Sequence, residues 1–206
     1  MAKILRLGLV LFIITAVTGI ILGGVYTLTL EPIRLTQLRE KNEALASTLP
    51  GATAFKEIPV KPGSGIVKDA YEGTADGKLI GYNFTVTPKG YGGLITLVVG
   101  MTPDAQVTNI KILAHTETPG LGAKAVDAAF TEQFKLKKVE EIFVSKTPVE
   151  ADDQIQAISG ATITSRAVAS GVNAATKYLK RDIQGAAAPA EDDKPDAASS
   201  ASQKGE

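Results

Sequence analysis

Residues 159–168 read SGATITSRAV, a turn of small and hydroxyl-bearing residues that leads into a regular apolar pattern. Beyond the turn, apolar residues recur at intervals of three or four, which is the spacing of one helix face. The pattern predicts a helix over Thr164–Ile183 whose buried face is formed by Val168, Val172, Ala175 and Leu179.

The start of this helix is the first candidate site. The N-terminal turn of a helix presents unpaired N–H groups and a positive dipole end, which together suit a phosphate. Gly160 and Ala161 leave room for a ligand near the backbone, and Arg166 lies one turn on, where it can pair with an anion. The same residues also describe an ordinary capped helix, with Thr162, Thr164 or Ser165 as the N-cap. The residues alone leave both interpretations open.

A second candidate segment is HTETPGLG at residues 115–122, which predicts a tight turn between a strand and a helix. Glu117 and Thr118 would project polar atoms there, and Leu121 could rest against an aromatic ring system. An ordinary connection explains the same residues. In KGYGGLI, residues 89–95, the glycines are expected to serve a bend, because no helix follows them to complete a nucleotide loop.

Four stretches rich in Val, Ile, Thr and aromatic residues precede these helices and are separated by turn residues, which predicts strands. They are Gly65–Tyr71, Leu79–Thr87, Leu94–Thr102 and Val107–Ala114. A further helical signal covers Ala123–Phe134. Strands grouped before helices favour an α+β fold, with an antiparallel sheet and packed helices.

The N-terminal region predicts a membrane anchor. Leu7–Leu30 contains no Asp, Glu, Lys or Arg, and a helix of this length spans about 36 Å, enough for a hydrocarbon core of about 30 Å. A cleaved signal peptide is the alternative, but its apolar region is shorter and ends at a small-residue site. We therefore divide the chain into a cytoplasmic N-terminus (1–6), a transmembrane helix (7–30), an amphipathic stalk helix and linker (31–64), a single domain (65–184) and a disordered tail (185–206).

Composition excludes several classes of chemistry. The chain has no cysteine and one histidine, which excludes iron–sulfur clusters, disulfides, a cysteine nucleophile and the usual zinc sites. Lys+Arg and Asp+Glu are equal at 22 each, so no basic excess indicates nucleic acid. We expect no catalytic side chain and no metal, and we interpret His115 as a structural hydrogen-bond partner. Any redox chemistry must therefore come from a cofactor.

The two candidate segments together resemble the signatures of the FMN-binding domain family. Ser159-Gly160-Ala161-Thr162 resembles its flavinylation motif, and Glu117-Thr118-Pro119-Gly120-Leu121-Gly122 resembles its flavin-pocket loop. The glycine-rich stretch around Tyr91 is similar to the family's strand entry, which makes Tyr91 a weaker candidate for flavin contact. The chain departs from the family pattern at Gln156, where an Asp is usual.

The resemblance implies a cofactor, FMN, joined through its phosphate to the hydroxyl of Thr162, with Thr164 as a lower-ranked alternative. It implies flavin-binding roles for two groups of residues, Glu117, Thr118, Gly120, Leu121 and Gly122 in the first segment and Ser159, Gly160, Ala161 and Arg166 in the second. The implied function is electron relay in a membrane ion-translocating ferredoxin:NAD oxidoreductase complex. The flavin-carrying C component of a sodium-pumping NADH:quinone oxidoreductase and an FMN-binding regulatory module are the alternatives.

The implied partners are the other membrane and redox subunits of such a complex, a flavin transferase during maturation and the lipid bilayer. Lys3 and Arg6 precede the apolar segment, but Arg34, Arg39 and Lys41 follow it, so charge hardly decides the orientation. Long domains translocate largely regardless of nearby charge. We therefore expect a single-pass protein of the cell membrane with its flavin domain on the extracytoplasmic side.

Overall fold

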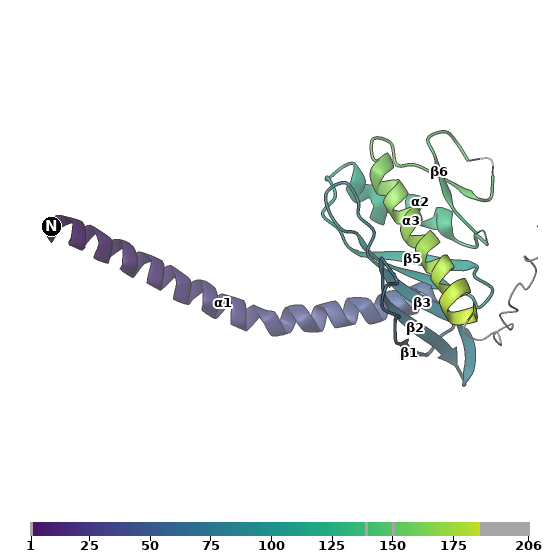
Figure 1. Cartoon of the computed structure of the whole chain (residues 1–206), viewed down its shortest axis with the longest axis horizontal. Coiled ribbons are helices and arrows are strands. Elements are labelled where there is room, and N and C mark those ends of the chain that lie inside the picture. Colours follow the sequence, from purple (N-terminus) through teal and green to yellow (C-terminus); the bar gives the residue numbers. More distant parts are fainter. Residues whose placement is uncertain (1, 139, 150, 186–206) are drawn as a thin grey trace, which may run out of the picture.

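A computed structural model describes residues 2–138, 140–149 and 151–185 of the 206-residue chain. It contains one long N-terminal helix followed by a folded domain with an antiparallel sheet and helices (Figure 1). The α+β prediction is confirmed. The tail expected at 185–206 lies outside the described residues from position 186 onward.

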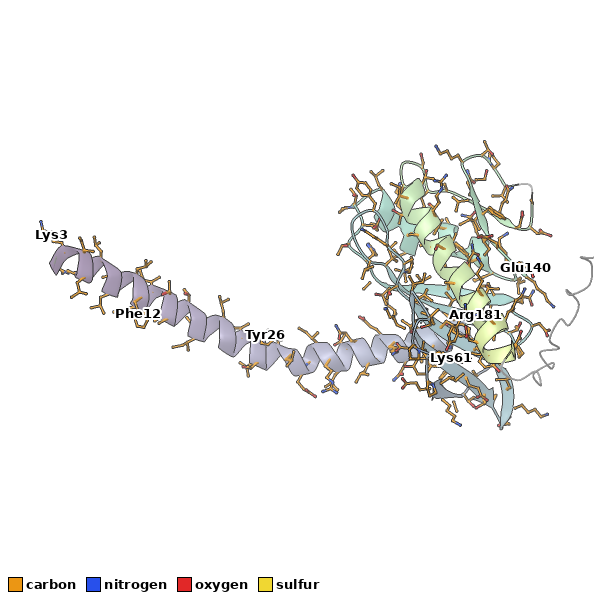
Figure 2. All side chains as sticks on the ribbon, viewed as in Figure 1. Lys3, Phe12, Tyr26, Lys61, Glu140 and Arg181 are labelled. Atoms are coloured by element: carbon orange, nitrogen blue, oxygen red, sulfur yellow. The ribbon has the colours of Figure 1, made fainter. Side chains whose placement is uncertain are left out.

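Helix α1 (Ala2–Thr48) is one continuous helix of 47 residues. Its apolar half is long and apolar enough to cross a membrane, and none of that half is buried in the protein. Figure 2 shows Phe12 and Tyr26 projecting from this free half, far from the domain. The stalk helix expected after residue 30 is therefore the continuation of the same helix, with Pro32 inside it. Within the segment expected to be an amphipathic stalk, Leu35 and Leu38 remain more than half exposed, and burial begins only at Ala44.

The sheet is a five-stranded antiparallel meander in which every strand pairs with its sequence neighbour, in the order β1-β2-β3-β4-β5. Its strands are β1 (Ala54–Ile58), β2 (Val67–Ala75), β3 (Lys78–Val86), β4 (Thr96–Met101) and β5 (Val107–Ala114). The four strands predicted from the sequence correspond to β2 through β5. Strand β1 lies in the segment expected to be linker, and it adds an edge to the sheet by pairing with β2.

Both faces of the sheet are covered, which explains why Leu97–Met101 of β4 is buried without interruption. Helix α3 (Thr162–Tyr178) packs on one face through the predicted stripe of Val168, Val172 and Ala175, which continues in Leu179 directly after the helix, and all four residues are fully buried. The hydrophobic core between α3 and the sheet includes Phe84. The Phe84 ring contacts the Tyr178 ring edge to face, with 5.9 Å between the ring centroids. Figure 1 shows α3 lying along the sheet.

The opposite face receives the end of α1, where Ala44 and Leu45 pack against Val98 of β4. A helix end leaves carbonyl groups without partners, and here side chains of the sheet bind them. Asn83 donates to the Leu45 carbonyl at 3.0 Å, Asn109 donates to the Ser47 carbonyl at 3.2 Å, and Thr108 donates to the Thr48 carbonyl. We call this set of contacts the anchor joint. At Gly100 of β4, an added Cβ would collide with the Thr48 carbonyl, so glycine permits this close approach.

The remaining elements connect β5 to α3. They are η1 (Gly122–Val126), α2 (Ala128–Thr131), η2 (Glu132–Phe134), β6 (Phe143–Ser145) and β7 (Gln154–Gln156), and Leu179–Gln184 (η3) extends α3 as a π-helical turn. The helix expected over 123–134 is thus three short pieces that bury Phe130 and Phe134. Strands β6 and β7 form a separate parallel pair. Asn173 of α3 fixes the start of this region by bonding both the N–H and the carbonyl of Ile142, at 2.8 and 3.1 Å.

Candidate functional site

The N-terminus of α3 is built by a turn rather than by a side-chain cap. Gly160 adopts a φ of +74°, a conformation that favours glycine, and Ala161 occupies the N-cap position without a side-chain hydrogen bond. The expectation that Thr162, Thr164 or Ser165 is the N-cap is therefore wrong. The Ser165 hydroxyl instead stabilises the turn from inside, because it accepts from the Ile158 N–H and donates to the Ala161 carbonyl, each at 3.0 Å.

This helix start leaves backbone donors available to a ligand. The first intrahelical bond runs from the Ser165 N–H to the Ala161 carbonyl at 3.0 Å. Within the described residues, the N–H groups of Thr162, Ile163 and Thr164 have no hydrogen-bond acceptor. Unpaired N–H groups at the positive end of a helix of 17 residues favour an anion.

The loop after β5 supplies a second wall. Its turn forms around Gly120, with a φ of +76°, and the Thr118 carbonyl accepts from the N–H groups of Leu121 and Ala123 at 3.2 and 3.1 Å. Glu117 is turned inward and is only 5% exposed. Its carboxylate accepts a hydrogen bond from the Thr164 hydroxyl, so this loop is tied directly to the first turn of α3.

A glycine hairpin supplies the third wall. Lys89 and Leu94 form a bridge, and the Gly90 N–H donates to the Gly93 carbonyl at 2.7 Å, so the chain reverses within six residues. The Gly92 N–H donates to the Glu117 carboxylate at 2.9 Å. Tyr91, at the tip, is 71% exposed. The hairpin thus presents an unburied aromatic ring beside the other two segments.

The three segments enclose a cavity of about 570 Å³. Such a volume lies in the range of about 300–1,000 Å³ that is typical of small-molecule and cofactor sites. The cavity is lined by Tyr91, Glu117, Thr118, Leu121, Gly122, Gly160, Ala161, Thr162, Ile163 and Thr164. It combines apolar side chains with free N–H groups at one end. This combination fits a ligand that carries both an aromatic ring and a phosphate.

Most of the residues that the sequence singled out meet in this cavity. Seven line it: Glu117, Thr118, Leu121, Gly122, Gly160, Ala161 and Thr162. Gly120 and Ser159 shape the adjoining turns and do not line it. Arg166 lies one turn farther along α3, where it lines a different cavity together with Glu141 and Lys177. The structure therefore does not bring the Arg166 guanidinium to the helix N-terminus.

Three lining residues stand outside the set singled out as flavin-binding. Ile163 is exposed on the first turn of α3, and its position follows directly from that of Thr162. Thr164 is expected from the sequence only as an alternative attachment point, yet its hydroxyl is committed to Glu117. Tyr91 is only a weaker candidate for flavin contact from the sequence. The signal that indicates it is an aromatic residue within a cluster of glycines.

Comparisons with known proteins show which family the chain resembles along most of its length. The model of the FMN-binding domain family matches residues 90–177, which include the hairpin tip and both motifs. The G component of the proton-translocating ferredoxin:NAD(+) oxidoreductase complex of Clostridium ljungdahlii is 38% identical over 163 residues, covering 79% of this chain and 84% of that protein. The G component of the Na(+)-translocating complex of Acetobacterium woodii is 35% identical over 184 residues, covering 82% and 88%.

Among solved structures, the chain is similar to the C component of the Na(+)-translocating NADH-quinone reductase from Parabacteroides distasonis, with 27% identity and a TM-score of 0.47. That alignment covers 54% of this chain and 61% of that one, which is less than two thirds of its length. With relatives at 38% and 35% identity along most of its length, and the family model matched across both motifs, the chain belongs to the FMN-binding domain family.

Proposed function

We propose that this chain is the FMN-carrying electron-relay subunit of a membrane ion-translocating ferredoxin:NAD oxidoreductase complex, with FMN joined by a phosphoester to Thr162. The observation that carries the proposal is the position of Thr162. Its side chain lines the cavity, is partly exposed, and is the first residue of α3, beside the unpaired N–H groups. A phosphate esterified at this hydroxyl would meet those donors and the positive end of the helix.

The alternative attachment point, Thr164, is disfavoured by its surroundings. It is 1% exposed, and its hydroxyl donates to the buried Glu117 carboxylate. Esterification there would remove the donor and leave a buried acceptor without its partner, which is costly. Within the described residues, no side-chain hydrogen bond engages the hydroxyl of Thr162. We therefore assign the attachment to Thr162 alone.

Attachment requires a group transfer whose parts can be named. A flavin transferase would supply FAD, the Thr162 oxygen would form a bond to the phosphorus of the FMN half, and the pyrophosphate bond would break. AMP would leave, and the hydroxyl proton would pass to a base.

Gln156, which replaces the family's usual Asp, has an exposed side chain outside the Thr162 cavity. Its backbone N–H donates to the Gln133 side chain at 2.7 Å.

Once bound, the flavin would supply one- and two-electron chemistry. The protein would bind the phosphate at the N-terminus of α3 and would offer the apolar side chains of Tyr91, Leu121 and Ile163 to the ring. Helix α1 would hold this site at the membrane. Relatives that belong to multi-subunit complexes support a role as one step in a relay.

The proposal is tested by purifying the chain from the membranes of its native host, in which the flavin transferase is active. We expect a band that fluoresces as flavin after denaturing electrophoresis, together with co-purified membrane and redox subunits. A fluorescent chain that purifies alone would favour a flavin module outside a respiratory complex. A dark band, beside a fluorescent control acceptor from the same cells, would overturn covalent attachment.

The extracytoplasmic position of the flavin domain is tested by labelling. The chain has no cysteine, so one introduced thiol is the only reactive thiol. Ser170 is exposed on α3, and we expect Ser170→Cys to react with a membrane-impermeant maleimide in intact cells, or in spheroplasts where an outer membrane is present. Lys3→Cys, on the other side of the apolar segment, should react only after lysis. The reverse pattern would place the flavin domain in the cytoplasm.

A further inference from the structure

The most unusual group in the cavity wall is the Glu117 carboxylate. It is 5% exposed, and within the described residues no Lys, Arg or His forms an ion pair with it. A buried carboxylate without partners is strongly destabilising. Its retention therefore depends on the hydrogen bonds that reach it.

Each oxygen of this carboxylate binds a different segment of the site. Oε1 accepts from the Gly92 N–H at 2.9 Å, and Oε2 accepts from the Thr164 hydroxyl. The donors lie 25 and 47 residues away in sequence, one in the hairpin and one in the first turn of α3. Each carboxylate oxygen therefore has a hydrogen-bond donor, and neither donor is a cation. One side chain thus connects all three walls of the cavity.

The glycines around Glu117 show that this connection is tightly packed. A Cβ added at Gly90 would collide with Oε1, and one added at Gly122 would lie 2.7 Å from Oε2. A Cβ at Gly92 or Gly93 would collide with the neighbouring Thr116. The glycine cluster, expected from the sequence to serve a bend, therefore also gives the hairpin a surface without side chains that fits against Thr116–Glu117.

We propose that Glu117 is the positioning residue of this site. It holds the hairpin against the first turn of α3, and so keeps Tyr91 and Thr162 in the lining of one cavity before a flavin arrives. Tyr91 immediately precedes the bonded Gly92, and Thr162 lies two residues before the bonded Thr164. Binding to a site that is already ordered avoids the cost of ordering loops around the ligand. This inference rests on the proposed flavin role of the cavity, whereas the linkage is a property of the protein alone.

The test uses the full-length chain with three variants. Glu117→Ala removes both hydrogen bonds. Glu117→Gln is nearly isosteric and can keep both, because its carbonyl can accept from Gly92 while its amide donates to the Thr164 oxygen. Thr164→Val removes only the link to α3. Two readouts are measured: hydrogen exchange of the Gly92 amide before flavin is added, and the steady-state kinetics of flavin attachment by the transferase.

For Glu117→Ala we expect Gly92 exchange to accelerate about tenfold or more, since the amide loses its acceptor. Flavin attachment should lose about tenfold in kcat, while the KM for FAD stays unchanged because the transferase binds FAD. Glu117→Gln should restore both values to within about threefold of the unmodified chain. Thr164→Val should slow attachment and leave Gly92 exchange close to normal.

Two results would overturn the proposal. One is a Gln variant as impaired as the Ala variant, which would assign the effect to charge rather than to linkage. The other is an Ala variant with normal Gly92 exchange and normal attachment. If Glu117→Ala does not fold, the Gln and Val variants still decide between the outcomes. If the unmodified chain carries no covalent flavin, the proposed function fails, and the exchange measurements still test the linkage by themselves.

Discussion

Thr162→Ala is expected to abolish covalent flavin completely, because it removes the oxygen that would carry the phosphate. The fluorescent band of the chain after denaturing electrophoresis should disappear, while the level of the protein stays unchanged. Stability should change little, since the side chain is partly exposed and no side-chain hydrogen bond engages its hydroxyl within the described residues.

The matched control is Thr162→Ser, which keeps a hydroxyl at the same position and should keep at least part of the fluorescence. Mass spectrometry of the peptide containing residues 159–168 would locate the added FMN. A fluorescent Thr162→Ala band would contradict the assignment and require another attachment point in the chain.

The largest expected loss of stability comes from Phe84→Ala. Phe84 is fully buried between the sheet and α3, where its ring meets Tyr178 edge to face and stacks on Tyr82 at 6.4 Å between centroids. Truncation would leave a cavity at the centre of the core, and we expect the free energy of unfolding to fall by about 3–5 kcal/mol. Because the chain has no tryptophan, urea unfolding of the full-length protein in detergent is best followed by circular dichroism.

Phe143→Ala makes the same chemical change at a side chain that is 53% exposed, on β6. It should reduce the free energy of unfolding by less than about 1 kcal/mol. Equal losses for the two variants would mean that the packing of α3 on the sheet does not dominate the stability of the domain.

The elements predicted correctly are those with a strong internal pattern. Strands β2 to β5 and helix α3 each carry enough apolar residues at a regular spacing to reveal their type. Strand β1 was not predicted because it is an edge strand of five mostly exposed residues, so burial imposed no alternation on it. Strands β6 and β7 have three residues each and exist only because two distant segments pair.

The site shows the same division between local and distant information. The turn at Gly160 and the start of α3 could be located from neighbouring residues, and the resemblance to the family added the Glu117 loop. Arg166 was grouped with the helix N-terminus by its spacing, but the cavity does not extend along α3 to the turn where Arg166 lies. The contacts of Glu117 with Gly92 and Thr164 cross long stretches of chain, and no local pattern encodes them.

The anchor joint has a mechanical consequence for any electron relay. Because α1 runs unbroken into the domain and the sheet binds its last carbonyls, no flexible linker separates the apolar segment from the domain within the described residues. The part of α1 beyond the apolar segment, residues 31–48, is about 27 Å long. If the helix tilts by about 20° in the bilayer, the C-terminal end of α1 and the domain attached to it would move sideways by about 9 Å. The tilt of the helix in the bilayer would then determine how far the flavin could move between its electron donor and its electron acceptor.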